Sequence, residues 1–339
     1  MQVAWHLQDC RAILFVGRDL KLVAVLGPGK RNRKNVQDRL CSSRDNLVSK
    51  QLLPEVSELS GMHRRYFLAL AFFTYSLALQ LHAQDVPYGT NDAAGHYVQL
   101  PDARIYYERY GQGGRPLVML HGGLYGYIDE FGDLIHELSK KRTIIAIATR
   151  GYGRSERGTL PLSHRQFAQD AADVLQKILP KGESVDLLGF SEGGISAYIL
   201  ASKHPELIHR VIAIGSPLGR PDKDSGPPIT PEIMEKQVPG LVATRKKQMP
   251  HPEQWEQLVR DLAQMYRGPV VFVKEEEIRA IQAPTLILAG EEDPTGRGRF
   301  VEIYRMLPKG QLAIIPGCGH VVFTCKFDVT LALISDFLQ

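Results

Sequence analysis

The six residues GFSEGG, from Gly189 to Gly194, place a single serine among glycines where two sequence patterns meet. The apolar run SVDLL at 184–188 comes directly before them and is typical of a strand buried on both faces. The stretch ISAYILASKHPEL at 195–207 follows and predicts a helix. Gly and Ser are common turn residues, so a lone G-x-S-x-G match carries little weight. A sharp turn from strand to helix, however, lifts the Ser191 hydroxyl out of the sheet edge, where it is exposed as a nucleophile.

The sequence on both sides of this turn alternates between strand-like and helix-like segments. Further strands are predicted from the apolar runs PLVML (116–120), TIIAIA (143–148), VIAIG (211–215), TLILAG (285–290) and QLAIIPG (311–317). Helices are predicted at 128–140, at 163–179 with Ser163 as N-cap, and at 327–339. Residues 96–110 alternate between apolar and polar positions, as a two-stranded hairpin would. This order predicts an α/β fold in which helices cover both faces of a parallel sheet.

One interval, residues 218–283, breaks this rhythm. It begins with GRPDKDSGPPITPEI, which is rich in proline, glycine and charge, and continues with helical patterns at 251–267 and 275–282. We therefore predict a core formed by residues 84–217 and 284–339, with a helical cap inserted at 218–283.

A nucleophilic serine needs a base that takes its proton, and that base is a histidine oriented by an acid. Asp293 follows the strand TLILAG within GEEDP, and His320 follows QLAIIPG within GCGH. The carboxyl ends of parallel strands share one edge of the sheet, so we expect both side chains to meet Ser191 there. Glu291 and Glu292 are alternative acids, and Asp293 is the preferred one.

The same chemistry needs donors for the oxyanion that forms on the substrate. The glycines of HGG at 121–123 end an earlier buried strand, and the helix that begins at Glu192 has free backbone N–H groups. We predict an oxyanion hole formed by the N–H groups of Gly123 and Glu192, with Leu124 as the alternative to Gly123. His121 precedes these glycines and is expected to pack behind them as a structural residue.

Five motifs of this chain resemble those of α/β-hydrolase fold proteins: HGG at 121–123, RGYGRS at 150–155, GFSEGG at 189–194, GEEDP at 290–294 and GCGH at 317–320. The resemblance covers residues 95–339 and implies an eight-stranded, mostly parallel sheet with a helical cap after the sixth strand. It also implies a triad of Ser191, Asp293 and His320, in the family's chain order. One departure is Ala148-Thr149, because family members usually carry an aspartate shortly before the RGxGxS turn.

The nucleophile narrows the activities within this family. A serine argues against the haloalkane dehalogenases and epoxide hydrolases, which use aspartate. The segment 187–216 is also similar to the valacyclovir hydrolase, or biphenyl hydrolase-like, branch, in which an acid directly after the nucleophile helps to recognise the substrate's amino group. Glu192 stands at that position, so an aminoacyl-ester preference is an alternative. A glutamate that merely favours the helix dipole is the other interpretation.

These observations predict a serine hydrolase of small-molecule carboxylic esters or lactones that needs neither a metal ion nor an organic cofactor. Leu124, Tyr125 and Trp255 are predicted to bind the substrate. For Tyr125, Tyr127, Trp255 and Tyr266, lining the pocket and packing in the core or at the surface are equal alternatives. One alternative is an aminoacyl-ester hydrolase or a peptidase of the proline iminopeptidase type. Another is a non-catalytic ligand-binding homologue of the same fold.

Charge and composition indicate an ordinary soluble chain without a nucleic-acid footprint. The 339 residues are 44% hydrophobic and 23% charged, with a net charge of +4. Residues 1–83 carry 12 lysines and arginines against 6 acidic residues, so the remainder is close to neutral. The oligomeric state is not readable from these features.

The segment MHRRYFLALAFFTYSLALQLHAQ, which begins at Met62, has the layout of a secretory signal peptide. A basic start precedes a short apolar run that ends in small residues, which predicts export to the periplasm or medium after cleavage near Ala83-Gln84. The run is too short for a stable membrane span. Residues 1–61 are then interpreted as a non-native or disordered upstream extension, with a genuine extension and an internal anchor as the alternative. An exported chain could join Cys318 and Cys325, but their spacing does not decide this.

Overall fold

The computed structural model describes residues 86–219, 229–268, 271–295 and 299–339, together with three two-residue strands near the N-terminus. The described strands and helices, from Ala12 to Phe337, all belong to one compact unit. The predicted signal peptide lies outside the described residues, as does most of the predicted extension, so these two assignments and the domain boundaries stay predictions.

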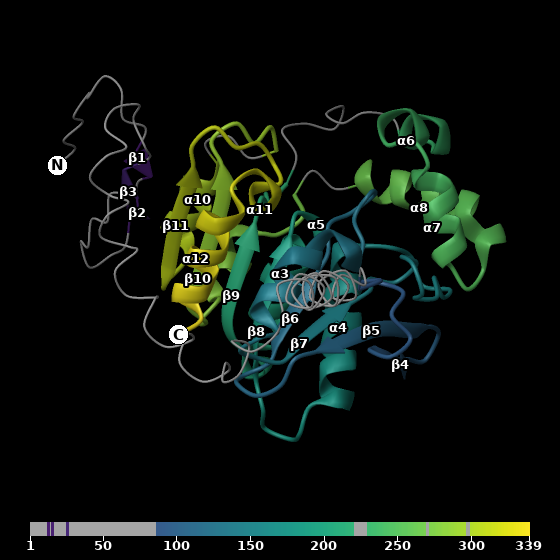
Figure 1. The fold of residues 1–339 in the computed structure, drawn as a ribbon, viewed down its shortest axis with the longest axis horizontal. Coiled ribbons are helices and arrows are strands. Elements are labelled where there is room, and N and C mark those ends of the chain that lie inside the picture. The colour runs from purple at the N-terminus through teal and green to yellow at the C-terminus, as the bar shows by residue number, and fades with distance from the viewer. Residues whose placement is uncertain are drawn as a thin grey trace, which may run out of the picture. The chain divides into compact units, whose positions relative to one another are not determined.

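Eight strands between residues 95 and 315 form one sheet (Figure 1). They are β4 (Gly95–Gln99), β5 (Arg104–Tyr110), β6 (Leu117–Leu120), β7 (Ile144–Ile147), β8 (Val185–Phe190), β9 (Ile208–Ile214), β10 (Thr285–Gly290) and β11 (Gly310–Ile315). The short strand β2 (Phe15–Val16) adds to β11, giving the order β2-β11-β10-β9-β8-β6-β7-β5-β4. Strands β6 to β11 are parallel, whereas β4, β5 and β2 are antiparallel to their neighbours. The predicted α/β fold with a mostly parallel sheet is confirmed.

The other two short strands, β1 (Ala12–Ile13) and β3 (Val25–Leu26), pair with each other.

Helices connect the strands and lie on both faces of the sheet. Those in the core of the fold are α3 (Gly132–Leu138), α4 (His164–Ile178), α5 (Glu192–Lys203), α10 (Arg299–Met306), α11 (Val322–Cys325) and α12 (Phe327–Phe337). Short 3-10 helices are η1 (Ile128–Phe131), η2 (Pro205–Leu207) and η3 (Pro252–Gln254). The Ser163 hydroxyl caps α4 as predicted, because it accepts a hydrogen bond from the Gln166 N–H at 3.0 Å.

Four helices lie between the sixth and seventh strands of the eight, at the interval that breaks the sequence rhythm. They are α6 (Pro231–Gln237), α7 (Leu241–Gln248), α8 (Trp255–Tyr266) and α9 (Glu275–Ala280). Figure 1 shows α6, α7 and α8 next to one another, in green. No helix of the described residues is long and apolar enough to cross a membrane.

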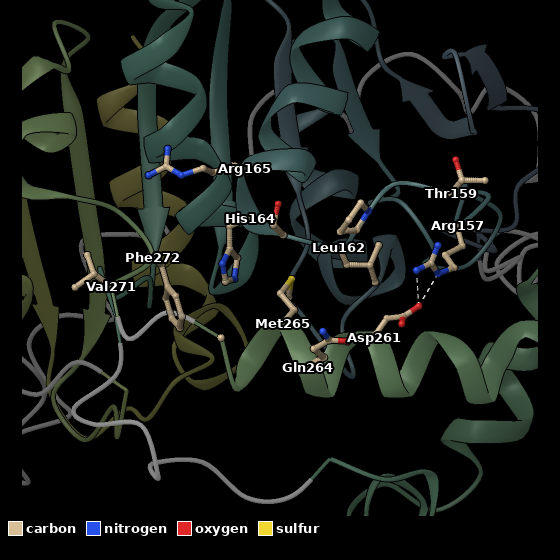
Figure 2. A pocket seen from close by; sticks show the side chains of 13 residues that line it. Arg157, Thr159, Leu162, His164, Arg165, Asp261, Gln264, Met265, Val271 and Phe272 are labelled. Atoms are coloured by element: carbon tan, nitrogen blue, oxygen red, sulfur yellow. Dashed lines mark hydrogen bonds and ion pairs between the residues drawn. The ribbon is translucent and has the colours of Figure 1, made fainter.

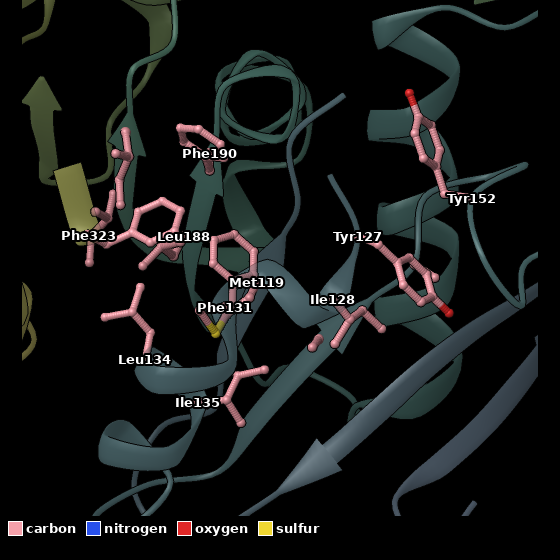
Figure 3. Close-up of a cluster of buried hydrophobic side chains, with 14 of the residues drawn as sticks. Met119, Tyr127, Ile128, Phe131, Leu134, Ile135, Tyr152, Leu188, Phe190 and Phe323 are labelled. Atoms are coloured by element: carbon pink, nitrogen blue, oxygen red, sulfur yellow. The ribbon is translucent and has the colours of Figure 1, made fainter. Parts of the chain in front are cut away.

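The core sits on both faces of the sheet because side chains alternate along each strand. Strands β6, β8 and β10 are buried along their whole length, as expected of central strands between two helical layers. Met119 and Leu188 belong to one hydrophobic cluster, and their neighbours Val118 and Leu187 belong to the other. Figure 3 shows Met119 and Leu188 beside Phe131, the residue that directly precedes α3. This packing fixes the strand ends from which the site is built.

Candidate active site

Ser191 occupies the sharp turn between β8 and α5. Its backbone has φ 50° and ψ −113°, a sparsely populated conformation for a residue with a side chain. The turn is held by a 2.8 Å hydrogen bond from the Ser191 N–H to the Ile214 carbonyl. A methyl group added to Gly189 would overlap the Gly193 carbonyl oxygen, and one added to Gly193 would overlap the Leu120 carbonyl oxygen. The flanking glycines therefore permit the close backbone packing that this turn requires.

His320 and Asp293 meet Ser191 at the carboxyl edge of the sheet. The His320 Nε2 atom lies 2.9 Å from the Ser191 hydroxyl oxygen, and Nδ1 lies 2.9 Å from Asp293 Oδ2. The imidazole also packs against the Phe190 ring at a centroid distance of 4.9 Å. With its Nδ1–H donated to the carboxylate, the imidazole presents Nε2 as an acceptor for the hydroxyl proton.

Asp293 is the acid that the structure brings to this histidine. Its side chain is fully buried, and Oδ1 accepts hydrogen bonds from the N–H and hydroxyl of Thr295 at 2.9 and 2.7 Å. Burial by itself would raise the pKa of Asp293, but the hydrogen bond and charge of His320 and the bonds from Thr295 bring that pKa below its usual value. The alternative acids Glu291 and Glu292 are exposed.

The two predicted oxyanion donors lie at neighbouring points of the structure. An added Cβ on Gly123 would lie 2.7 Å from Glu192 Oε2, so the two residues approach within contact distance. Leu124 donates its N–H to the Tyr152 hydroxyl at 3.1 Å, and Gly122 donates its own to Glu130. In the described part of the chain, the N–H groups of Gly123 and Glu192 donate to no protein acceptor, which leaves both for a ligand.

The Glu192 side chain forms a buried cluster with two tyrosines and a histidine. Its Oε2 accepts a hydrogen bond from the Tyr266 hydroxyl and lies 4.0 Å from His164 Nε2, and the Tyr152 hydroxyl is close enough to influence the pKa of the carboxyl. Burial raises the pKa of Glu192 to about 7, although both tyrosine hydroxyls act to lower it. Among the described residues, Glu192 Oε1 has no hydrogen-bond partner.

His121 and Glu130 support the glycine loop from behind. The Thr149 N–H donates to His121 Nε2 at 2.9 Å, so Nδ1 carries the proton and donates to the Gly122 carbonyl at 2.7 Å. Burial lowers the pKa of His121 to about 4, so the imidazole is neutral. Desolvation raises the pKa of Glu130 to about 8. This arrangement fits the expected structural role of His121. Thr149, at the position where the chain departs from the family's usual aspartate, holds His121 through its backbone N–H.

The three predicted substrate-binding residues have different environments. Leu124 lies in the glycine loop with φ 57°, and Tyr125 is partly exposed with its hydroxyl donated to Gln237 on α6. Trp255 is only 3% exposed and packs in a hydrophobic cluster. The structure thus keeps Leu124 and Tyr125 beside the oxyanion donors and packs the Trp255 ring among apolar side chains.

A cavity of about 540 Å³ lies between α8 and the beginning of α4 (Figure 2). His164, Met265 and Phe272 line it, and the triad residues do not. The Arg157 guanidinium in its wall is paired with Asp261 at 2.6 Å. His164 in its wall lies 4.0 Å, measured from Nε2, from Glu192 Oε2.

Two features of the site carried little or no signal in the sequence. Gly215 follows β9, and a Cβ there would lie 3.0 Å from the His320 ring and 3.1 Å from Asp293 Oδ2. Cys318 and Cys325 form a disulfide with a Cα–Cα distance of 5.8 Å, and His320 lies inside the loop that it closes. The spacing of the cysteines left this pairing open, and Gly215 was marked only by its place at the end of a strand.

Comparison with known proteins places this chain among hydrolases. A family model described as "Alpha/beta hydrolase family" matches residues 117–330. The human protein "Serine hydrolase BPHL" is 29% identical over 255 residues, covering 71% of this chain and 85% of the relative. The "Pimeloyl-[acyl-carrier protein] methyl ester esterase" of Yersinia enterocolitica is 24% identical over 262 residues, covering 70% and 98%.

A solved structure described as "Est816 as an N-Acyl homoserine lactone degrading enzyme" shares the fold. Its TM-score is 0.58 at 23% identity, and the match covers 71% of this chain and all of the solved chain.

Proposed function

This chain belongs to the alpha/beta hydrolase family, and from that premise we propose that it hydrolyses carboxylic esters or lactones of small molecules through an acyl-enzyme intermediate on Ser191. The observation that carries the proposal is the continuous set of hydrogen-bond distances from Ser191 through His320 to Asp293, at 2.9 Å each. The relatives are themselves hydrolases, among them an esterase of a methyl ester. The family assignment and the prediction of an ester-acting hydrolase are thus confirmed.

The proposed reaction begins when the Ser191 hydroxyl oxygen attacks the carbonyl carbon and His320 Nε2 takes the hydroxyl proton. Asp293 holds the imidazole in the required tautomer and stabilises the imidazolium that forms. The N–H groups of Gly123 and Glu192 receive the oxyanion. His320 then returns the proton to the departing alcohol oxygen as the ester bond breaks. His320 then deprotonates a water molecule that attacks the acyl-serine, and it returns this proton to the Ser191 oxygen as the acyl–oxygen bond breaks and the acid leaves.

Substitution of the nucleophile tests this proposal. Ser191→Ala should lower kcat for short p-nitrophenyl esters by at least about 10³-fold, because the acyl-enzyme can no longer form. Covalent labelling by a fluorophosphonate probe should be lost with it, while circular dichroism and Tm stay close to those of the parent. Undiminished turnover by Ser191→Ala would refute catalysis at this serine. A parent protein that is neither labelled nor active on any ester or lactone would favour the non-catalytic alternative.

A preference for aminoacyl esters is a second candidate, favoured by the unpartnered Oε1 of the Glu192 carboxyl beside the proposed oxyanion hole. An ammonium group on the substrate would give this atom a charged partner. The comparison that decides is kcat/KM for a valine ester against its N-acetylated form. A clear advantage of the free amine supports this candidate, and equal values exclude it.

Export of the protein is proposed from the signal-peptide pattern and is supported by the Cys318–Cys325 disulfide, since such bonds persist in oxidising compartments. N-terminal sequencing of the protein recovered from the periplasm or medium tests it. A mature start near Gln84 is expected, and a product that retains Met1 would contradict both the export and the interpretation of residues 1–61.

A further inference from the structure

We propose that Tyr266, on the inserted helix α8, is a positioning residue for the oxyanion hole and acts through the carboxyl group of Glu192. This role rests on the proposed function, because the two amides concerned are those assigned to the oxyanion at Ser191. The inserted helices between β9 and β10 would then contribute to the reaction through Tyr266, a role that no motif in the sequence indicated.

The contacts of one hydroxyl carry the inference. The Tyr266 hydroxyl donates to Glu192 Oε2, and a Cβ added to Gly123 would overlap the same hydroxyl oxygen. Tyr266 therefore touches both residues whose N–H groups face the oxyanion. The Gly123 position also excludes any side chain, because the tyrosine hydroxyl and the glutamate carboxyl already fill that space.

A second tyrosine completes the connection between the two donors. The Tyr152 hydroxyl accepts a hydrogen bond from the Leu124 N–H at 3.1 Å and lies near enough to the Glu192 carboxyl to act to lower its pKa. The glycine loop after β6 and the beginning of α5 are thus joined through two phenols and one carboxyl. Hydrogen bonds inside such an enclosed network are stronger than the same bonds in water.

This cluster matters for the rate because an oxyanion hole works by preorganisation. Its donors must already lie about 2.7–3.1 Å from the position that the oxyanion will take, and small displacements lower kcat. Removal of one donor typically costs about 10²–10³-fold in kcat. Loss of a hydroxyl that only positions the donors should cost less, roughly tenfold.

The charge of Glu192 gives this cluster a pH signature. The titratable groups facing Glu192 are Tyr266 from α8, Tyr152 from the segment after β7, His164 from α4 and Glu130 from η1. Burial lowers the pKa of His164 to about 4, so none of these four is a cation at neutral pH. Because burial raises the pKa of Glu192 to about 7, its carboxylate forms above that pH, beside the amide that should hold an oxyanion. Turnover should therefore decline as the pH rises through about 7.

The first experiment removes only the hydroxyl. We expect Tyr266→Phe to lower kcat for p-nitrophenyl acetate roughly tenfold, with KM changed less than about twofold, because the amides are displaced and the substrate contacts are not. The rate of fluorophosphonate labelling should fall in parallel. Tyr97→Phe is the matched control, since Tyr97 is 45% exposed on the edge strand β4 and should keep parental kinetics.

The second experiment keeps the shape of the acid and removes its charge. Glu192→Gln retains an oxygen that accepts from Tyr266, and its kcat at each pH is compared with its own value at pH 6. The decline with its midpoint near pH 7 should disappear, because this side chain no longer ionises. A purely structural role of the cluster would alter Tm without altering the pH profile.

Unaltered kcat and labelling rate in Tyr266→Phe would overturn the positioning role. A decline that keeps its midpoint near pH 7 in Glu192→Gln would overturn the part assigned to the carboxyl, whereas a remaining step near pH 8 belongs to Glu130. If Tyr266→Phe does not fold, the pH profile of Glu192→Gln still decides. Failure of the proposed function is distinguishable, since Ser191→Ala would then remain active. An inactive Ser191→Ala protein with a fully active Tyr266→Phe protein refutes the positioning role alone.

Discussion

Gly215 ends strand β9 with φ 59°, and it has no side chain where the triad is most crowded. A methyl group on its Cα would lie 3.0 Å from the His320 imidazole and 3.1 Å from Asp293 Oδ2. The hydrogen bond that orients the imidazole thus depends on empty space beside it as well as on its partner.

We expect Gly215→Ala to lower kcat roughly tenfold, because the added methyl group displaces the imidazole from Ser191 and Asp293. Gly182→Ala is the matched control. Gly182 also has a positive φ, of 85°, but nothing within 4 Å of an added Cβ. Both variants should lose roughly 1–2 kcal/mol of unfolding free energy, as left-handed backbone disfavours a side chain. Urea denaturation gives the folded fraction of each variant. Equal kcat per folded molecule in Gly215→Ala and Gly182→Ala would contradict this role of Gly215.

For single residues, the sequence predicted the positions that follow strands, but it predicted few of the side chains that contact them. Ser191, Asp293 and His320 each follow an apolar run, and the shared edge of a parallel sheet brings such positions together. The contact of Tyr266 with Glu192 joins residues 74 positions apart, and no local pattern encodes a pairing of that kind. The ring of Trp255, for which substrate binding stays a prediction, packs among apolar side chains because α8 turns an apolar side toward them.

At the scale of elements, Arg150 connects three segments that are distant in sequence. Its guanidinium is 1% exposed, lies 2.6 Å from Asp170 on α4 and 2.7 Å from Asp102 in the turn between β4 and β5. These bonds raise the pKa of Arg150 and lower the pKa of Asp102, so both side chains stay charged. The arginine thereby joins the antiparallel hairpin, the end of β7 and a helix of the core.

We expect Arg150→Ala to lower the free energy of unfolding by about 3–5 kcal/mol, because it leaves the buried Asp170 carboxylate and the partly buried Asp102 carboxylate without their cation. Urea denaturation with linear extrapolation measures this loss. Arg279→Ala is the control, since Arg279 and its partner Glu275 are 59% and 70% exposed and such a pair contributes only a few tenths of a kcal/mol. A loss in Arg150→Ala no larger than in Arg279→Ala would refute the structural role.

Most elements were predictable from the sequence because strand and helix periods differ. The runs at 184–190 and 285–290 became β8 and β10, and Ser163 caps α4 as its side chain suggested. RGYGRS at 150–155 was recognised only as a motif of the resemblance. Its arginine's partners lie 48 and 20 residues away, and their identity follows from the sheet order, which local pattern does not specify.

At the scale of the whole molecule, the order of strands explains how distant segments make one site. Strand β9 separates β8 from β10, and β11 follows β10, so the ends that carry Ser191, Asp293 and His320 lie along one edge. The segment after β11 is then closed on itself by the Cys318–Cys325 disulfide.

We expect the double variant Cys318→Ala, Cys325→Ala to lose about 2–3 kcal/mol of unfolding free energy, as cleavage of a short covalent loop frees the unfolded chain. Its kcat should also fall, because His320 lies within that loop. Thermal unfolding and p-nitrophenyl acetate turnover measure the two effects. Reductant should bring the parent toward the variant and leave the variant unchanged, and a parent insensitive to reductant in both assays would contradict the expectation.

That covalent closure makes the activity proposed for His320 depend on the compartment in which the chain was made. Protein synthesised in a reducing cytosol will carry free thiols on either side of the imidazole, and its specific activity will rise when oxidised glutathione is added. Recombinant preparations from cytosol and from an oxidising compartment will then differ in turnover while sharing one amino-acid sequence, and the titre of free thiols will account for the difference.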